Sequence, residues 1–156
     1  MKPKILVTRE VFDDTLDYLK QHCEVESNQA DVAFTPAQLA ERAANKAGIV
    51  CCIPDNIDAT LIAACSGLKA VANIAVGYNN IDMAAVRARG VVATNTPDVL
   101  TESVADFTWA LMLAITRRLS EGERVVRRGA WAGWAFDYML GTELRGAQLG
   151  LVGFGR

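Results

Sequence analysis

Ala47-Gly48-Ile49-Val50-Cys51-Cys52-Ile53-Pro54 opens the most informative stretch of the sequence with an apolar run closed by a proline. A second, mostly apolar run follows at 68–74, and the residues between them, 58–65, have the composition of a short helix. Strands that are apolar throughout, with a helix between them, are typical of a parallel sheet that helices cover on both faces. The stretch therefore predicts an α/β fold.

The same alternation extends in both directions from this stretch. A Thr-Pro pair at 35–36 is a typical helix start, with the threonine as N-cap and the proline at the first helical position. Gly90 is placed to end another helix. The further predicted elements are strands over 4–8 and 91–94 and helices over 13–23, 35–44 and 82–89. We expect a doubly wound parallel sheet over the first hundred residues.

A different element begins after Thr101. No proline interrupts 102–128, which predicts one long helix, and its first half is apolar on nearly every side. Such a helix has to be buried against another domain or another subunit. Its second half carries five arginines together with Glu121 and Glu123, a mixture that favours a solvated helical face over an anion site.

Composition excludes several classes of function. The net charge of −2 offers no basic surface for nucleic acid or an anionic membrane. No transmembrane run is present, and the first residues enter a strand too quickly for a signal peptide, so we expect a cytoplasmic protein. The four cysteines have no C-x-x-C spacing and are expected as free thiols. His22, the only histidine, is expected on the surface, and we expect no metal site.

Two segments are candidate sites. In 71–82 a strand end leads into a glycine turn and a helix-capping aspartate, so the backbone N–H groups of Val76 and Gly77 could hold a carboxylate at the carboxyl end of the sheet. The alternative is a tight turn that needs glycine. The second segment, 150–156, reads as a short strand that runs into the first two glycines of a G-x-G-x-x-G loop, whose third glycine would fall at position 158.

Taken together, these segments resemble the D-isomer-specific 2-hydroxyacid dehydrogenases, and most closely their glyoxylate and hydroxypyruvate reductase branch. The resemblance covers the whole chain. The residues that carry it are Gly77 with Asn80-Ile81-Asp82, the block Gly90-Val91-Val92-Ala93-Thr94-Asn95-Thr96-Pro97-Asp98-Val99-Leu100-Thr101-Glu102-Ser103-Val104-Ala105-Asp106, and Gly141-Thr142-Glu143-Leu144-Arg145-Gly146 leading into Gly150-Leu151-Val152-Gly153-Phe154-Gly155-Arg156.

The resemblance implies a domain organisation. Residues 1–99 would be the N-terminal part of a flavodoxin-like substrate domain, and 100–156 the start of a Rossmann cofactor domain that stops inside the glycine loop. The helix over 102–128 would be the dimerisation element, which accounts for its apolar surface. By the same resemblance, Val76 and Gly77 receive the substrate carboxylate and Thr101 lies beside the nicotinamide. Gly153, Gly155 and Arg156 would belong to the pyrophosphate loop.

The implied activity is hydride transfer between NAD or NADP and a small 2-oxo or 2-hydroxy acid such as glyoxylate or hydroxypyruvate, in a homodimer. The family's catalytic arginine, glutamate and histidine, and the residue that separates NAD from NADP, lie in the second half of a longer chain. The 156 residues are therefore expected to be an N-terminal fragment that is inactive alone.

A non-enzymatic, dinucleotide-sensing binding protein on the same scaffold is the alternative to this enzyme. A receiver-type regulatory module would need acidic residues where Thr8-Arg9 and Ile53-Pro54 stand.

Overall fold

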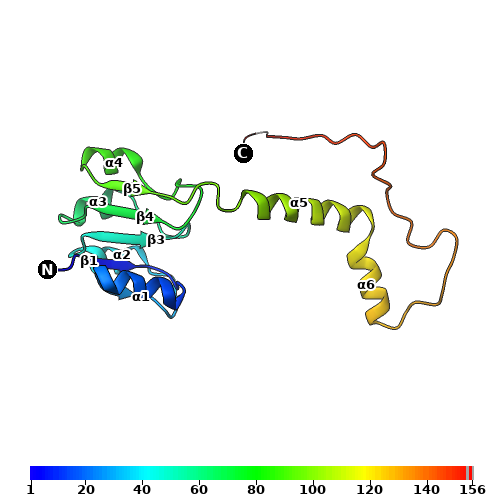
Figure 1. Ribbon diagram of the computed structural model, residues 1–156, viewed down its shortest axis with the longest axis horizontal. Coiled ribbons are helices and arrows are strands. Elements are labelled where there is room, and N and C mark those ends of the chain that lie inside the picture. Colours follow the sequence, from blue (N-terminus) through cyan, green and yellow to red (C-terminus); the bar gives the residue numbers. More distant parts are fainter. Residues whose placement is uncertain (154, 156) are drawn as a thin grey trace. The chain divides into compact units, whose positions relative to one another are not determined.

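The computed structural model describes residues 1–153 and 155 of the chain. The chain divides into two compact units, residues 1–99 and 100–156 (Figure 1). In the first unit strands and helices alternate, and the five strands form one parallel sheet. Its strands are β1 (Lys4–Val7), β2 (Glu24–Ser27), β3 (Gly48–Cys51), β4 (Ala70–Asn73) and β5 (Val92–Thr94), and its helices are α1 (Asp13–His22), α2 (Pro36–Ala43), α3 (Ala59–Ala64) and α4 (Met83–Ala88).

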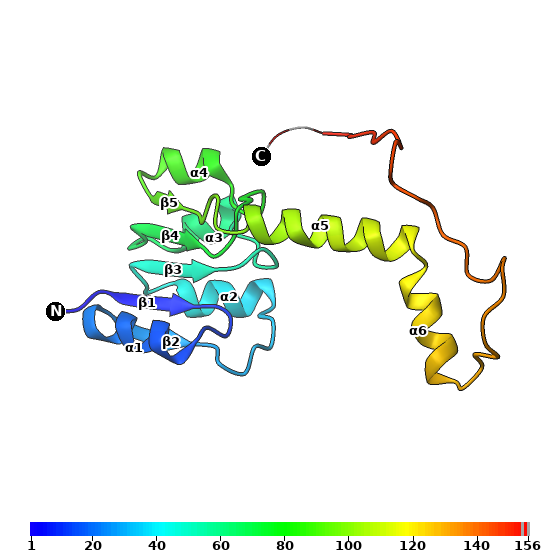
Figure 2. The same cartoon turned by 45° about the vertical axis from the view of Figure 1, so that its right-hand side comes forward.

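The strand order β2-β1-β3-β4-β5 confirms the doubly wound α/β sheet. The chain moves outward from β1 to β2, crosses back over β1 to β3, and then continues in that direction. Because parallel crossovers are right-handed, this reversal places α1 on one face and α2, α3 and α4 on the other. Figures 1 and 2 show the five strands side by side, with α1 at the end of the sheet formed by β1 and β2.

The main core lies between the sheet and the three helices α2, α3 and α4. Leu6 of β1, Ile49 of β3 and Val71 of β4 are at most 1% exposed and point into this layer. The helices contribute apolar side chains to the same cluster, namely Leu39, Ala43, Leu61, Ile62 and Val86. Each Å² of apolar surface removed from water contributes about 25 cal/mol to the free energy of folding, so the packing of these side chains stabilises the first unit.

Three of the four helices in the first unit begin with a side-chain cap, as predicted for Thr35 and Asp82, whereas α1 begins after Phe12 without one. Thr35 and Gln38 form a reciprocal capping box at α2, with Pro36 at the first helical position. Asp58 accepts a hydrogen bond from the backbone N–H of Leu61, and Asp82 accepts from two N–H groups of α4. Gly90 ends α4 with a φ of 64°, as expected for a helix-terminating glycine.

Strand β2 was absent from the sequence-based expectation. Its sequence, Glu-Val-Glu-Ser, has one apolar residue and lies at the sheet edge. Glu26 binds Lys46 at 2.7 Å and Arg42 at 2.6 Å. Its pKa is lowered, first by the hydrogen bond from Lys46. Pairing with β1 thus forms a strand whose composition is too polar to predict, and the two ion pairs of Glu26 add to it.

The second unit holds two helices, α5 (Thr101–Thr116) and α6 (Leu119–Arg127), where one helix was expected over 102–128. That expectation is corrected. The break lies at Arg118, which has a φ of 53° and donates its N–H to the carbonyl of Ile115. Glycine usually occupies such a left-handed helix-ending position, so an arginine there gave no signal. Its guanidinium forms two hydrogen bonds to Glu121, at 2.7 and 2.8 Å.

The short strand expected at the start of 150–156 is likewise corrected, because residues 150–152 have no regular secondary structure. A strand needs a hydrogen-bonded neighbour, and the described part of the second unit contains no strand to pair with it.

No side chain of α5 is buried, and Phe107, Trp109 and Ile115 are more than half exposed. None of the described helices is both long and apolar enough to cross a bilayer.

Candidate functional site

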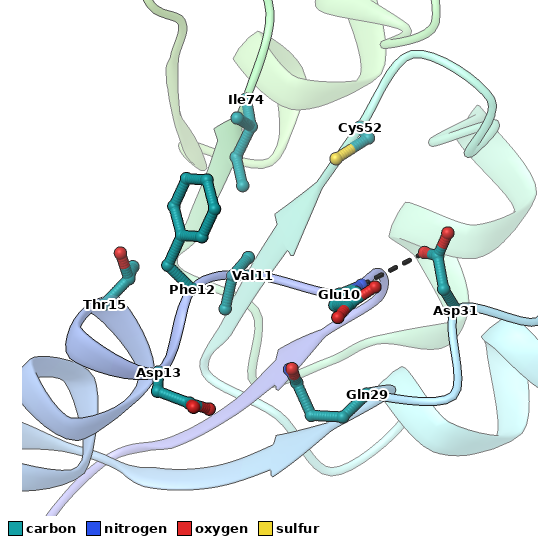
Figure 3. Close-up of a pocket in the computed structure, with 9 residues that line it drawn as sticks. All are labelled: Glu10, Val11, Phe12, Asp13, Thr15, Gln29, Asp31, Cys52 and Ile74. Atoms are coloured by element: carbon teal, nitrogen blue, oxygen red, sulfur yellow. Dashed lines mark hydrogen bonds between the residues drawn. The ribbon is translucent and has the colours of Figure 1, made fainter.

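The five parallel strands of the first unit all end on the same side of the sheet, and we call this border, formed by their carboxyl ends, the carboxyl edge. Ligands of open α/β sheets gather outside this edge. A cleft of about 690 Å³ lies there and is lined by residues that follow β1, β2, β3 and β4. Figure 3 shows its lining, Glu10, Val11, Phe12, Asp13, Thr15, Gln29, Asp31, Cys52 and Ile74.

One wall of the cleft is held by an ion pair. The Arg9 guanidinium donates to both carboxylate oxygens of Asp31, at 2.8 and 3.2 Å, and the backbone N–H of Glu10 donates to the same carboxylate at 3.1 Å (Figure 3). The hydrogen bond from Arg9 lowers the pKa of Asp31, and the pKa of Arg9 is raised for the same reason. Phe12 and Ile74 supply apolar surface, since their side chains are 88% and 45% exposed.

A buried polar network supports the strand ends beneath the cleft. Asp55 is 5% exposed and accepts hydrogen bonds from the Thr8 hydroxyl at 2.6 Å and from the Cys52 N–H at 2.9 Å. Asn80 donates to the carbonyls of Cys52 and Asp55 and to the side-chain oxygen of Asn73. Every buried side-chain polar atom in the described residues has a partner. The loops after β1, β3 and β4 are therefore joined into one hydrogen-bonded unit.

The loop after β4 carries the predicted carboxylate site. Three consecutive carbonyls of this loop are bound by the protein. Ala75 O accepts from the Thr96 N–H at 2.9 Å, Val76 O from the Asn95 side-chain amide at 2.8 Å, and Gly77 O from the Asn73 side-chain amide at 2.8 Å. The N–H groups of Val76 and Gly77 donate no hydrogen bond to any residue that the structure describes. Two backbone donors are thus available to a ligand.

The turn does not account for the glycine at position 77. Gly77 lies outside the left-handed region, and a Cβ atom added to it would meet no atom within 4 Å. The protein's own backbone and packing would therefore accept a side chain here. The alternative of a turn that needs glycine lacks structural support, whereas an anion that approaches the backbone closely would need the space that glycine leaves.

The chain's other reactive groups lie away from this arrangement or are inert. His22 ends α1 and is exposed, with its ring 5.1 Å from that of Tyr18, and only Cys23 separates it from β2. It therefore lies at the amino edge of the sheet, opposite the cleft. All four cysteines are free thiols. Burial raises the pKa of Cys51 to about 12 and also raises that of Cys52. No group of three His, Cys, Asp or Glu residues within the described part of the chain could hold a metal ion.

The predicted cofactor residues belong to the second unit. Thr101 is the first residue of α5 and is exposed. Gly153 has a φ of 87°, a conformation that favours glycine, and a Cβ at Gly153 or Gly155 would meet open space. The assignment of both glycines to a phosphate-binding loop stays a prediction. Arg156, the remaining predicted cofactor residue, lies outside the described residues, as does position 154.

Sequence reasoning missed the residues that orient the loop. Asn73 interrupts an apolar strand and is 2% exposed, so a polar residue in an apolar run was the available signal. Asn95 binds Val76 across 19 residues of sequence, a pairing that spacing alone does not reveal. The cleft residues Phe12, Cys52 and Ile74 share one signal, since each follows the end of a strand.

Ligands of open, doubly wound α/β domains bind outside the carboxyl ends of the strands, and two unbonded backbone donors lie there in this domain. The comparison with known proteins is more specific. Residues 5–141 match the model of the D-isomer specific 2-hydroxyacid dehydrogenase catalytic domain. The chain belongs to that family.

Individual relatives agree with this assignment. A glyoxylate reductase from Thermococcus onnurineus is 41% identical over 160 aligned positions, which cover 100% of this chain and 48% of the relative. An NADPH-dependent glyoxylate/hydroxypyruvate reductase from Sinorhizobium meliloti, solved with NADP and malonate, has a TM-score of 0.66 at 36% identity over 84% of this chain and 40% of its own. A 2-hydroxyacid dehydrogenase from Ketogulonicigenium vulgare has a TM-score of 0.72 at 32% identity over 92% of this chain and 45% of its own. The chain spans about half the length of the relatives it matches.

Proposed function

We propose that this chain forms the substrate-carboxylate half of an NAD(P)-dependent oxidoreductase that acts on a small 2-oxo or 2-hydroxy acid such as glyoxylate or hydroxypyruvate. The observation that carries the proposal is the pair of unbonded N–H groups at Val76 and Gly77, which lie at the carboxyl edge of the sheet. The chain that contains this sheet belongs to the 2-hydroxyacid dehydrogenase family. Two neighbouring N–H donors can bind one carboxylate, and hydrogen bonds to a charged group are stronger than neutral ones.

In this proposal residues 1–99 are part of the substrate domain and 100–156 begin the cofactor domain, which matches the division of the chain into two units. Thr101, Gly153, Gly155 and Arg156 contribute to the dinucleotide site. The nicotinamide supplies or accepts the hydride. The residues of this chain bind the acid through the Val76 and Gly77 amides, which hold its carboxylate in place for the hydride transfer.

We further propose a homodimer in which α5 and α6 form the subunit interface. The support is the row of apolar side chains on α5, none of which is buried within the chain itself. A cytoplasmic location agrees with four free cysteines, because reducing compartments keep thiols unpaired.

A chimera tests the enzymatic proposal. This chain replaces the matched segment of the Thermococcus onnurineus glyoxylate reductase, which then supplies the second half. We expect glyoxylate-dependent oxidation of NADH or NADPH. A folded chimera that binds the dinucleotide but oxidises none with glyoxylate or hydroxypyruvate would contradict the enzyme and favour the alternative, a dinucleotide-sensing binding protein.

A further inference from the structure

The carbonyl contacts of the loop after β4 determine where its N–H groups point. A trans peptide unit is planar, with its C=O and the following N–H directed to opposite sides. The Ala75 carbonyl and the Val76 N–H belong to one such unit, and the Val76 carbonyl and the Gly77 N–H to the next. Fixing each carbonyl therefore fixes the direction of one candidate donor.

The partners of these carbonyls come from elsewhere in the fold. Thr96 N–H and the Asn95 side-chain amide follow β5 and bind Ala75 O at 2.9 Å and Val76 O at 2.8 Å. Asn73, at the end of β4, binds Gly77 O at 2.8 Å and is itself bound to Asn80. Two neighbouring strand ends thus hold three successive peptide units by their carbonyls. Their N–H groups face away from these partners.

We propose that Asn95 is a positioning residue for the carboxylate site, which it serves by holding the Val76–Gly77 peptide with the Gly77 N–H directed at the ligand. Asn95 touches no ligand itself. The inference rests on the proposed function, because it requires that the acid is bound at Val76 and Gly77. A donor that is already oriented loses less entropy on binding, so an unheld peptide binds the same carboxylate more weakly.

The variant Asn95→Ala removes the amide that binds Val76 O, and Asn28→Ala is its matched control. Asn28 is also half-buried, lies in the same unit and donates its side-chain amide to two backbone carbonyls, those of Thr8 at 3.0 Å and Val32 at 2.7 Å. Both variants lose amide–carbonyl hydrogen bonds. Only the first changes the loop after β4.

The experiment is a titration of the ¹⁵N-labelled 156-residue chain with oxamate, a small 2-oxo acid analogue, followed by TROSY NMR. In the unmodified chain we expect saturable shifts of the Val76 and Gly77 amide resonances. Asn95→Ala should raise the Kd for oxamate about five-fold or more, the equivalent of one lost hydrogen bond, while Asn28→Ala leaves it unchanged. The order parameter of the Gly77 amide should fall from about 0.85 to below about 0.6 in Asn95→Ala alone.

A second pair of variants keeps the test decisive if Asn95→Ala fails to fold. Asn95→Asp preserves the shape and removes the donor, and Asn79→Asp adds the same charge at an exposed position of the same loop. We expect the first to weaken oxamate binding more than the second. Equal effects, or an unchanged Kd in Asn95→Ala, would overturn the role of Asn95 and leave the carboxylate site intact. If oxamate does not shift Val76 and Gly77 in the unmodified chain, the carboxylate site fails and this inference fails with it.

Discussion

At the scale of single residues, the proposed carboxylate site depends on what each backbone atom of the loop after β4 binds. The sequence identified Val76 and Gly77, because a glycine turn follows a predicted strand at the ligand-binding edge of the sheet. It did not identify Asn73 or Asn95 as their supports. Side-chain amides that bind distant carbonyls leave no periodic pattern in a sequence, so only the folded chain reveals them.

The buried thiol of Cys51 gives a prediction for alkaline pH. Burial raises its pKa from 9.0 to about 12, so between these values the folded state keeps a proton that the unfolded state has lost. Stability is then fully present below pH 9 and falls as the pH rises, by at most about 1.4 kcal/mol per pH unit for this group. Urea unfolding at pH 8 to 11 should show the decline, and Cys51→Ser should flatten it. An equal flattening by Cys23→Ser, at the half-exposed end of α1, would contradict this origin.

At the scale of helices and strands, apolar runs located β3 and β4 but not their ends. The runs predicted over 47–53 and 68–74 became Gly48–Cys51 and Ala70–Asn73, because pairing with the neighbouring strand, rather than hydrophobicity, sets where a strand stops. Strand β2 and the break at Arg118 were missed for a related reason. Each lacks the residue type that marks such an element in a sequence, since β2 has one apolar residue and an arginine instead of a glycine occupies the left-handed position.

The capping box of α2 gives a prediction at this scale. Thr35 accepts the N–H of Gln38 and the Gln38 side chain accepts the N–H of Thr35, so Thr35→Ala removes one of two reciprocal bonds. We expect it to lower the free energy of unfolding by about 1 kcal/mol, measured as a lower urea midpoint at constant m. Thr35→Ser should restore most of the loss. A Ser variant as unstable as the Ala variant would show that the methyl group, and not the hydroxyl cap, stabilises the helix.

At the scale of the whole molecule, the second unit leaves a large apolar surface without a partner. Phe107, Leu111 and Ile115 recur on one face of α5 and are 62%, 46% and 75% exposed. Patches beyond a few hundred Å² are unusual on soluble monomers and favour association. The sequence predicted the apolar helix, but what covers it depends on chains or segments that the sequence pattern does not identify.

We therefore expect the 156-residue chain to self-associate, with a mass by light scattering that rises with concentration. The pair of substitutions Phe107→Glu and Leu111→Lys should reduce this, whereas Gln21→Glu, an exposed charge change on α1, should not. A compact monomer at the same concentrations, with amide exchange in α5 as slow as in the β-sheet, would contradict the expectation.

The same chain, assayed alone, should show no glyoxylate-dependent oxidation of NADH or NADPH. Its only histidine lies at the amino edge of the sheet, away from the cleft, so no imidazole is placed to protonate a carbonyl at the proposed site. The assay uses purified chain at concentrations up to those at which it associates. Turnover above that of a Gly77→Val control would show that residues within this chain suffice for the chemistry.

The KM for glyoxylate of Gly77→Val, measured in the chimera that carries this chain, tests whether the Val76 and Gly77 amides bind the substrate. A Cβ atom added at this position meets no other atom of the protein within 4 Å, so we expect the valine variant to keep its Tm and a kcat within a few-fold of the parent. The valine side chain would obstruct the carboxylate at the Val76 and Gly77 amides. We therefore expect the KM for glyoxylate to rise by about an order of magnitude or more. An unchanged KM at full stability would contradict the claim that these two amides bind the substrate.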